Sequence, residues 1–326
     1  MSNLGSLKLA IGIPTLNRVF DLKITLESIL KNTILPDKII IADQSDDDNT
    51  YKLIKDYQNN SNADFVYLRI DKKGLTHARN VILENLNDID IVTFLDDDVT
   101  LDKSYIEHIK NTFEKDKKVS GVQGFIIQDK IKVLKEFLKL NFNKIFGKPR
   151  VYEDFKNTYP LIVKKGQIIE SEWLSGCNMS YRVKDIKGEK FEEQFILYAL
   201  GEDLEFSHRL YLKGKRLLMN TSALLVHRVS NTGRLPSRAK ITMNFGYRRY
   251  MIAKYREKNR IDEIFESYIN FLKSQLRFLK YNSPKKFYDI SKIIDESLEI
   301  VKLYKEEIDN LNLENFNRKI LEELKK

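Results

Sequence analysis

The chain has 326 residues, of which 42% are hydrophobic and 32% are charged with both signs interspersed, so it is a folded globular protein rather than a disordered one. A single cysteine, Cys177, excludes an internal disulfide framework and a zinc site built from cysteines. The net charge is +9, and the segment Arg228–Arg260 alone carries ten Lys or Arg against one acid, which predicts a local contact with a polyanion.

The first residues, Met1–Ala10, contain no basic segment followed by an apolar run, and no stretch of the chain approaches 18 uncharged apolar residues. We therefore expect neither a secretory signal nor a membrane-spanning helix. This predicts a cytoplasmic protein, with any membrane contact peripheral and on the inner face of the cell membrane.

The first hundred residues alternate between short apolar strands and single helices. The predicted strands are Leu7–Ile13, Lys38–Ala42, Phe65–Ile70 and Ile89–Leu95, with helices predicted around Leu22–Leu30, Thr50–Gln58 and Gly74–Leu86. This alternation predicts an α/β fold with a mostly parallel sheet and right-handed crossovers, in which ligands bind beyond the carboxyl ends of the strands. Three polar clusters follow strand ends and should converge there: Asn17–Arg18, Asp43–Asp48 and Asp96–Asp98.

The rest of the chain has a less regular pattern, which becomes helical towards the C-terminus. Strands are predicted at Val119–Gln128, Asn178–Arg182, Arg216–Asn220 and Ala223–His227, helices at Lys130–Phe146 and Glu202–Lys213, and a loop at Gly147–Gly166. From Pro236 to Lys326 the pattern predicts a C-terminal helical extension, with breaks near Asn259–Arg260, Ser283–Pro284 and Asn310–Asn312.

The segment 236–260 combines apolar residues at helical spacing with interleaved cations and tyrosines. These residues are Ile241, Phe245, Ile252 and Tyr255, then Arg238, Lys240, Arg248, Arg249, Lys254, Arg256 and Lys258, and the rings of Tyr247 and Tyr250. One interpretation is a helix that packs on the rest of the protein, and the other is a contact with an anionic membrane surface. The helices after Ile261 are mixed in charge and offer a third interpretation, a homo-oligomer contact.

Asp96, Asp97 and Asp98 form the sharpest chemical feature, because three adjacent carboxylates follow a buried strand. Such carboxylates repel one another and are tolerated in a solvated turn or beside a cation. Oxygen-rich sites suit Mg²⁺ or Mn²⁺, which also bind phosphate oxygens. The alternative is a solvated turn before the helix that contains Tyr105 and Ile109.

The order of these motifs resembles glycosyltransferase family 2, a group of inverting enzymes with the GT-A fold. The matching motifs are Ile13–Arg18 (IPTLNR), Ala42–Asp47 (ADQSDD), Gly74–Asn80 (GLTHARN), Asp96–Asp98 (DDD), Trp173–Arg182 (WLSGCNMSYR), Gly201–Glu205 (GEDLE) and His227. The resemblance covers about Leu7 to Gly233 and implies a Rossmann-like, mostly parallel central sheet flanked by helices. It also implies a GT-A catalytic domain at 1–235, with a nucleotide-binding half about 1–100 and an acceptor half about 101–235, followed by the helical region 236–326.

The resemblance implies a site for a nucleotide-diphosphate sugar donor and a Mn²⁺ or Mg²⁺ ion. The residues that it assigns to the donor are Pro14, Thr15, Asn17, Arg18, Asp43, Gly74, Arg79, Asp96 and Asp97. Asp98 and His227 would hold the metal, and either Asp96 or Asp97 would contact the ribose. The alternatives are structural: Asp43 caps a turn, Arg79 is a cation on a helix surface, and His227 ends a strand.

Asp203 is the candidate general base, because inverting transfer needs one carboxylate to take the acceptor proton. It opens a predicted helix, where the helix dipole also favours an ordinary acid. Glu202, Gly176 and Trp173 are assigned to the acceptor, a saccharide or lipid-linked saccharide, although a lone Trp equally fits core packing. The basic loop Arg228–Arg234 is expected to close over the diphosphate.

The resemblance implies a metal-dependent glycosyltransferase, a hexosyl- or deoxyhexosyltransferase of surface polysaccharide or glycoconjugate synthesis. A sugar-phosphate nucleotidyltransferase would use a similar acidic rim, but no glycine-rich phosphate loop lies near the N-terminus. A nucleic-acid-binding protein is disfavoured, because the basic charge lies in one segment and no nucleic-acid motif is present.

Overall fold

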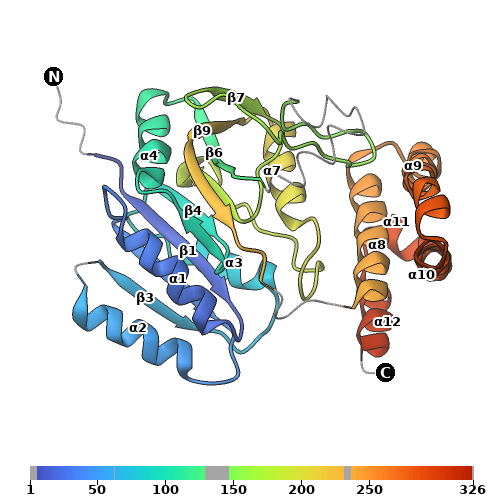
Figure 1. Cartoon of the computed structure of the whole chain (residues 1–326), viewed down its shortest axis with the longest axis horizontal. Helices are drawn as coiled ribbons and strands as arrows, with labels where there is room; N and C mark the ends of the chain where they lie inside the picture. Colours follow the sequence, from blue (N-terminus) through green and yellow to red (C-terminus); the bar gives the residue numbers. More distant parts are fainter. Residues whose placement is uncertain (1–5, 62, 129–146, 231–235, 325–326) are drawn as a thin grey trace. The chain divides into compact units, whose positions relative to one another are not determined.

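The computed structural model describes residues 6–61, 63–128, 147–230 and 236–324 (Figure 1). The chain forms two compact units. The first comprises Met1–Arg150, Thr158–Glu192 and Glu202–Gly233, and the second comprises Val151–Asn157, Glu193–Gly201 and Arg234–Lys326.

The first unit begins with four parallel strands separated by helices, as predicted. These elements are β1 (Leu9–Thr15), α1 (Val19–Leu30), β2 (Lys38–Asp43), α2 (Asn49–Asn60), β3 (Phe65–Arg69), α3 (Leu75–Glu84) and β4 (Ile91–Leu95). The strands lie in the order β3-β2-β1-β4 and pair in parallel. The carboxyl ends of β1, β2 and β4 therefore lie at one edge of the sheet.

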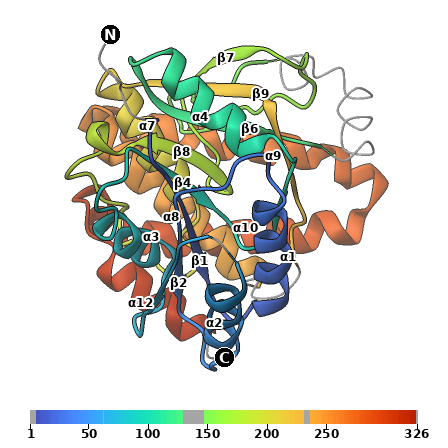
Figure 2. The ribbon, with the colours of Figure 1, turned by 90° about the vertical axis from the view of Figure 1, so that its left-hand side faces the viewer.

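Both faces of this parallel block are apolar and covered, which explains its runs of Ile, Val and Ala. Ile11 and Ile39 belong to the core on the face of α1, and Ala10 and Ile40 belong to the core on the face of α3. Figure 2 shows α1 and α2 on one side of these strands and α3 on the other. At Gly12, a Cβ atom would lie 2.6 Å from Cγ2 of Ile82, so this glycine permits the close approach of α3.

The remaining strands extend the same sheet with mixed directions. They are β5 (Val99–Leu101), β6 (Val119–Ile126), β7 (Ile168–Ser171), β8 (Asn178–Arg182) and β9 (Arg216–His227), accompanied by α4 (Tyr105–Lys115), η1 (Val183–Asp185) and α7 (Glu202–Leu212). The strand order continues from β4 to β8, β6, β9 and β5, and β7 pairs with β9. The predicted α/β fold with a central sheet, flanking helices and C-terminal helices is confirmed.

Some sequence predictions in this region need correction. The two strands predicted at 216–220 and 223–227 form one strand, β9, whose register against β6 shifts between Gly124 and Phe125. The strands β5 and β7 were not predicted, because segments of three and four residues carry little pattern. The helix predicted at 130–146 lies outside the described residues.

The second unit is helical, and its breaks agree with the sequence prediction. Its elements are α8 (Ser237–Tyr255), η2 (Lys258–Arg260), α9 (Ile261–Asn282), α10 (Pro284–Leu303), α11 (Lys305–Asp309) and α12 (Glu314–Leu324). One further break, at Tyr304, separates α10 from α11. Within the described part of the chain, every helix is too short or too polar to cross a bilayer.

Helix α8 forms the centre of the second unit, and its burial removes two of the arginines on which the membrane interpretation of residues 236–260 relied. All residues from Phe245 to Ile252 are buried, including Arg248 and Arg249. Arg249 donates hydrogen bonds to Asp309 at 2.7 Å and to Asp262 at 2.7 Å, so its charge is neutralised inside the unit. These two arginines therefore cannot reach lipid, because helices and loops from elsewhere in the unit cover them.

Candidate active site

The polar clusters predicted to meet at the carboxyl edge of the sheet do so. Asp43 ends β2, Arg18 follows β1, and Asp96–Asp98 follow β4. β9 ends at His227, which pairs with Val99 directly after the acidic triplet. Strand pairing thus places His227 beside residues that lie about 130 positions earlier in the chain.

The three adjacent aspartates have different environments. Asp97 is 3% exposed, accepts a hydrogen bond from Thr15 Oγ1 at 2.8 Å and pairs with Arg18 Nη1 at 2.8 Å. Burial raises the pKa of Asp97 to about 7, against the influence of Arg18 and Thr15. The side chain of Asp97 is therefore directed into the protein, whereas Asp96 keeps 28% of its side chain exposed.

Asp96 and Asp98 share a cluster with His227. Asp98 Oδ1 lies 2.9 Å from His227 Nε2, and Asp96 Oδ2 lies 3.9 Å from the same nitrogen. One ligand atom from each residue falls within 4.8 Å of the other two. Burial alone would lower the pKa of His227, but its contact with Asp98 raises that pKa to about 11.

These three side chains fit a divalent cation. Asp98 Oδ1 is buried, and among the described residues its close polar partner is His227 Nε2 at 2.9 Å, although the pair does not have the geometry of a hydrogen bond. A cation would take the place of that contact between the two atoms. Two carboxylates and one imidazole suit Mn²⁺, which accepts nitrogen as well as oxygen ligands, better than Mg²⁺, which prefers oxygen. A bound cation would need His227 in its neutral form.

Arg18 contacts the acidic triplet directly. Its Nη2 atom donates to Asp98 Oδ2 at 2.7 Å, while Nη1 pairs with Asp97. Asp98 Oδ2 also accepts a hydrogen bond from the Ser230 amide at 2.9 Å. Arg18, which was assigned to the donor, thus bridges two of the carboxylates and fixes the oxygen of Asp98 that faces away from His227.

Arg228 binds the backbone of the acidic turn through its guanidinium, a role that no sequence motif indicated. Its guanidinium donates to the carbonyl oxygens of Val99 at 2.5 Å, Asp21 at 2.8 Å and Asp97 at 3.4 Å, and to the hydroxyl of Thr25 at 3.2 Å. The Arg228 amide also donates to Asp98 O at 2.9 Å. Arg228 was expected in a loop that closes over the diphosphate, but its side chain is held beneath the triplet. Residues 231–235 of that loop lie outside the described residues.

The predicted nucleotide loop is linked to the end of β2. Asn17 has a positive φ of 55°, and its side chain exchanges hydrogen bonds with Asp46 at 2.8 Å in both directions. Asp43 is fully buried and accepts hydrogen bonds from Tyr67 OH at 2.7 Å and the Ser45 amide at 2.9 Å. Pro14 lies within β1, paired with Ala42, rather than in the loop.

Gly74 precedes α3 and has a φ of +146°, a backbone conformation that residues with a side chain rarely adopt. Its carbonyl accepts a hydrogen bond from Gln44 Nε2 at 3.2 Å, which joins the start of α3 to the end of β2. Gln44 was not assigned a role from the sequence.

Arg79 connects the acidic triplet to the candidate base. It is 1% exposed, so it is not a cation on a helix surface. Its guanidinium pairs with Glu202 Oε1 at 2.5 Å and Asp96 Oδ1 at 3.2 Å, and donates to Gly176 O at 3.1 Å. The Gly176 amide in turn donates to Asp203 Oδ2 at 2.8 Å.

Gly176 is surrounded on three sides by these groups. A Cβ atom there would lie 3.1 Å from Arg79 Nη2, Glu202 Oε1 and Asp203 Cβ. Both Asp203 oxygens accept backbone hydrogen bonds, from Gly176 and from Leu204 at 2.7 Å. Burial nevertheless raises the pKa of Asp203, and it raises that of Glu202 to about 8.

Trp173 is 7% exposed, and its indole N–H donates to Thr158 O at 2.9 Å. Its ring meets that of Tyr159 edge to face, with 6.2 Å between the centroids. This environment favours core packing over stacking on an acceptor sugar.

Comparison with known proteins supports the same family. Residues 10–166 match the family model "Glycosyl transferase family 2", and residues 91–251 match "Glycosyl transferase family group 2". The chain is similar to the O-antigen chain rhamnosyltransferase RfbN of Salmonella typhimurium, with 34% identity over 107 residues. That alignment covers 32% of this chain and 32% of the relative, so it spans about a third of the relative's length.

The fold is similar to those of solved structures. A structure of GalNAc-T7 with UDP, GalNAc and Mn²⁺ matches with a TM-score of 0.57 and 16% identity, over 77% of this chain and 51% of that one. Residues 1–349 of S. aureus TarS match with a TM-score of 0.55 and 16% identity, over 94% of this chain and 84% of that one. At this identity the similarity concerns the GT-A fold alone. The two family models together match residues 10–251, and on these matches the chain belongs to glycosyltransferase family 2.

Proposed function

We propose that the chain is a metal-dependent, inverting glycosyltransferase that moves a hexose or deoxyhexose from a nucleotide-diphosphate sugar to an acceptor hydroxyl. The observation that carries this proposal is the convergence of Asp96, Asp98 and His227 at the carboxyl edge of the sheet. The candidate base Asp203 is joined to this cluster through Gly176 and Arg79.

Asp98 and His227 would hold the cation, with Asp96 beside them. When bound, a divalent cation neutralises the charge that develops on the leaving diphosphate. Asp97 is turned towards Thr15 and Arg18, which leaves Asp96 as the better candidate to contact the ribose or the sugar. Asp43, Asn17 and Arg79 would lie along the nucleotide, as the family resemblance implies.

Asp203 would act as the general base. The acceptor oxygen attacks the anomeric carbon, its proton passes to Asp203, and the bond from the anomeric carbon to the diphosphate oxygen breaks with inversion. Glu202 forms an ion pair with Arg79 and is therefore less available for proton transfer than Asp203. The two oxygens of Asp203 accept hydrogen bonds from the backbone amides of Gly176 and Leu204. Glu202 would instead help to orient the acceptor.

The similarity to an O-antigen chain rhamnosyltransferase supports a deoxyhexose donor and a saccharide or lipid-linked saccharide acceptor in surface polysaccharide synthesis. That similarity covers 107 residues, about a third of each chain, so the sugar itself needs a direct assay. A panel of nucleotide sugars, including dTDP-, UDP- and GDP-linked hexoses and deoxyhexoses, tests this point.

The deciding experiment measures release of nucleoside diphosphate and transfer to an acceptor, with Mn²⁺ and with a chelator. Asp98→Asn is compared with Asp102→Asn, which changes an exposed aspartate four residues further along the chain. We expect the chelator and Asp98→Asn to abolish transfer while Asp102→Asn preserves it. Full activity with the chelator would overturn metal dependence, and no transfer from any nucleotide sugar would overturn the function.

A further inference from the structure

Helices α9 and α10 form an antiparallel hairpin in the second unit. Lys273 Nζ lies 3.0 Å from Asp295 Oδ1, and Lys305 Nζ, just beyond α10, lies 2.6 Å from Asp262 Oδ2. Residues before the turn thus pair with residues at a similar distance after it. Only Ser283 separates the two helices.

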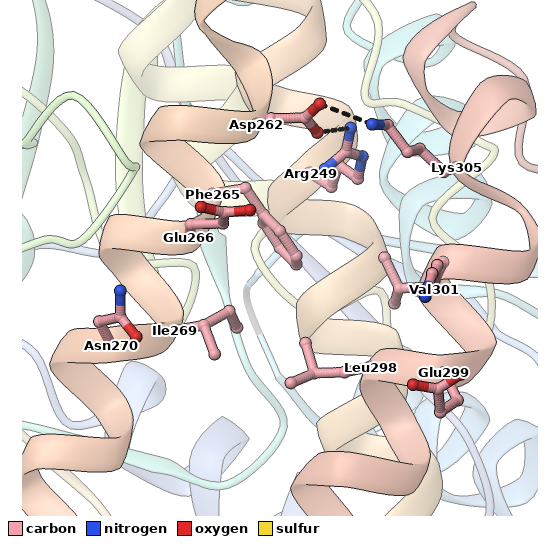
Figure 3. Close-up of a pocket in the computed structure, with 11 residues that line it drawn as sticks. Arg249, Asp262, Phe265, Glu266, Ile269, Asn270, Leu298, Glu299, Val301 and Lys305 are labelled. Atoms are coloured by element: carbon pink, nitrogen blue, oxygen red, sulfur yellow. Dashed lines mark hydrogen bonds and ion pairs between the residues drawn. The ribbon is translucent and has the colours of Figure 1, made fainter.

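Among the side chains that the structure describes in this hairpin, the buried ones all lie in one half. In α9 these are Ile261, Ile264, Phe265, Tyr268 and Ile269, and in α10 they are Ile294, Ser297, Ile300 and Val301. Figure 3 shows this inner half, where a pocket of about 400 Å³ is lined by Phe265, Ile269, Leu298 and Val301, and where Asp262 meets Arg249 and Lys305. Asp262 is thus paired with two cations at this end.

The other half, residues 270–293, has no buried residue among those whose side chains the structure describes. The turn lies about 15 Å beyond the Lys273–Asp295 pair, at 1.5 Å of helix per residue. Because its described side chains bury little apolar surface, this half of the hairpin contributes little to the free energy of folding of the second unit. Its exposed surface is therefore available to a partner.

The composition of this half is strongly biased. Residues 270–293 contain six Lys or Arg against one acid, Asp289. At the tip, four lysines are exposed: Lys280, Lys285, Lys286 and Lys292. Between them lie two tyrosines with unusually high exposure, Tyr281 at 84% and Tyr288 at 68%.

We propose that this hairpin tip, residues 280–292, docks onto an anionic lipid bilayer. Lysines near such a surface are attracted to its phosphates, and tyrosines place an apolar ring and a polar hydroxyl at the boundary between water and hydrocarbon. The charge complementarity identifies the partner. The proposal does not depend on the glycosyltransferase activity.

Two other partners fit the tip less well. A symmetric contact with a second copy would bring the same basic surface against itself, and the two sets of lysines would repel each other. A nucleic acid is bound through grooves or stripes that follow its backbone, whereas the end of a two-helix hairpin is convex. A flat anionic surface meets a convex basic tip without either difficulty.

Flotation of the full chain with vesicles tests the proposal. Vesicles of phosphatidylcholine alone are compared with vesicles that also contain phosphatidylglycerol, at low and high salt. The test variant carries Lys280→Gln, Lys285→Gln, Lys286→Gln and Lys292→Gln. The matched control carries Lys31→Gln, Lys115→Gln, Lys117→Gln and Lys118→Gln, which are four exposed lysines of the first unit.

We expect the wild type to bind only the anionic vesicles, and high salt to release it. Each lysine near an anionic surface contributes about fivefold to partition, so the four substitutions of the test variant should together cost nearly three orders of magnitude, while the control binds as the wild type does. A variant with Tyr281→Ser and Tyr288→Ser should bind more weakly without a change in salt dependence. The thermal unfolding of all variants is measured beside binding, because these exposed side chains should leave it unchanged.

Three outcomes would overturn the proposal: no binding of the wild type to anionic vesicles, equal binding by the test variant and the control, or equal binding to both kinds of vesicle. A tip-dependent dimer in light scattering, with no lipid binding, would assign the surface to a second copy. Tip-dependent binding of an oligonucleotide, with no lipid binding, would assign it to nucleic acid.

Discussion

Asp96, Asp97 and Asp98 are chemically identical neighbours, and the backbone alone separates their roles. The three residues lie in the turn between β4 and β5. Asp97 is directed to Thr15 and Arg18, whereas Asp98 lies between Arg18 and His227 and Asp96 lies near His227. Asp97 and Asp98 are both buried, but Asp98 places a carboxylate oxygen 2.9 Å from His227 Nε2, and Asp97 anchors the turn. A triplet of acids can thus supply a structural anchor and a cation site within three residues.

At Asp203, substitution tests the proposed base. Asp203→Asn keeps the shape of the side chain and one of its two backbone hydrogen bonds, because the amide nitrogen cannot accept, and it cannot take the acceptor proton. We expect turnover to fall by about 10²–10⁴ while the affinity for the nucleoside diphosphate stays within a few-fold. Steady-state kinetics and calorimetry measure the two quantities. Turnover close to the wild-type value would transfer the role to another group, with Glu202→Gln as the next variant.

Arg228 is expected to control metal affinity without touching the metal. In Arg228→Gln, the carbonyls of Asp97, Val99 and Asp21 lose their shared donor, so the turn that presents Asp98 becomes less fixed. Loss of such a supporting group typically costs about 10–100-fold in metal affinity. Titration of Mn²⁺ followed by electron paramagnetic resonance measures it.

The control for Arg228 is Arg216→Gln, at the other end of β9, where the arginine pairs with Glu170 on the surface. Equal Mn²⁺ affinity in both variants would show that Arg228 is only a packing residue. No Mn²⁺ binding by the wild type would remove the metal site itself, and this role with it.

Among the elements, those with a complete local pattern were predictable from the sequence. The parallel strands are buried on both faces, so they appear in the sequence as continuous apolar runs such as the one in Lys38–Asp43. The bounds of β8 are the predicted ones. Helix breaks at Ser283 and near Asn310 follow from proline and asparagine. The short β5 and β7 exist only because β9 offers them a partner, which no local pattern records.

Helix α8 shows why the rest was not predictable. Its cations and apolar residues suggested one polar face, but segments 151–157 and 193–201 join its unit and cover it. Arg248 donates to Asp154 O at 3.0 Å, and the ring of Phe195 stacks on Tyr247 with 4.4 Å between centroids. The same limit applied to Arg228, whose partners at Asp21 and Thr25 lie some two hundred residues away.

Within the second unit, the contact between α8 and α12 depends on Gly246. A Cβ atom at Gly246 would lie 2.2 Å from Phe316 Cζ, and Phe316 is fully buried. Glycine to alanine inside a helix normally stabilises by about 1 kcal/mol. Here we expect overpacking to reverse the sign and to destabilise by about 1–3 kcal/mol. Chemical denaturation measures the change, with Lys240→Ala on the exposed side of α8 as the control; a more stable Gly246→Ala variant would contradict the close packing.

For the molecule as a whole, ligand binding should appear as a gain in thermal stability. The site presents the carboxylates of Asp96, Asp98 and Asp203, and a nucleoside diphosphate brings further negative charge. Without a cation these charges repel, so neither partner should bind well alone. With Mn²⁺ between them, repulsion becomes attraction, and each partner should strengthen the binding of the other.

Thermal unfolding with Mn²⁺, with the nucleoside diphosphate and with both tests this coupling. A ligand at a hundred times its Kd stabilises by about 2.7 kcal/mol, and each kcal/mol raises the Tm by about 2–4 °C in a domain of this size. We expect a rise of several degrees only when both are present, its loss with a chelator, and its absence in Asp98→Asn. If the diphosphate alone produced the full rise in Tm, then Arg18 and the other basic side chains at the carboxyl edge of the sheet would be enough to neutralise its charge. The acidic cluster would then be a structural feature of the sheet edge rather than a cation site.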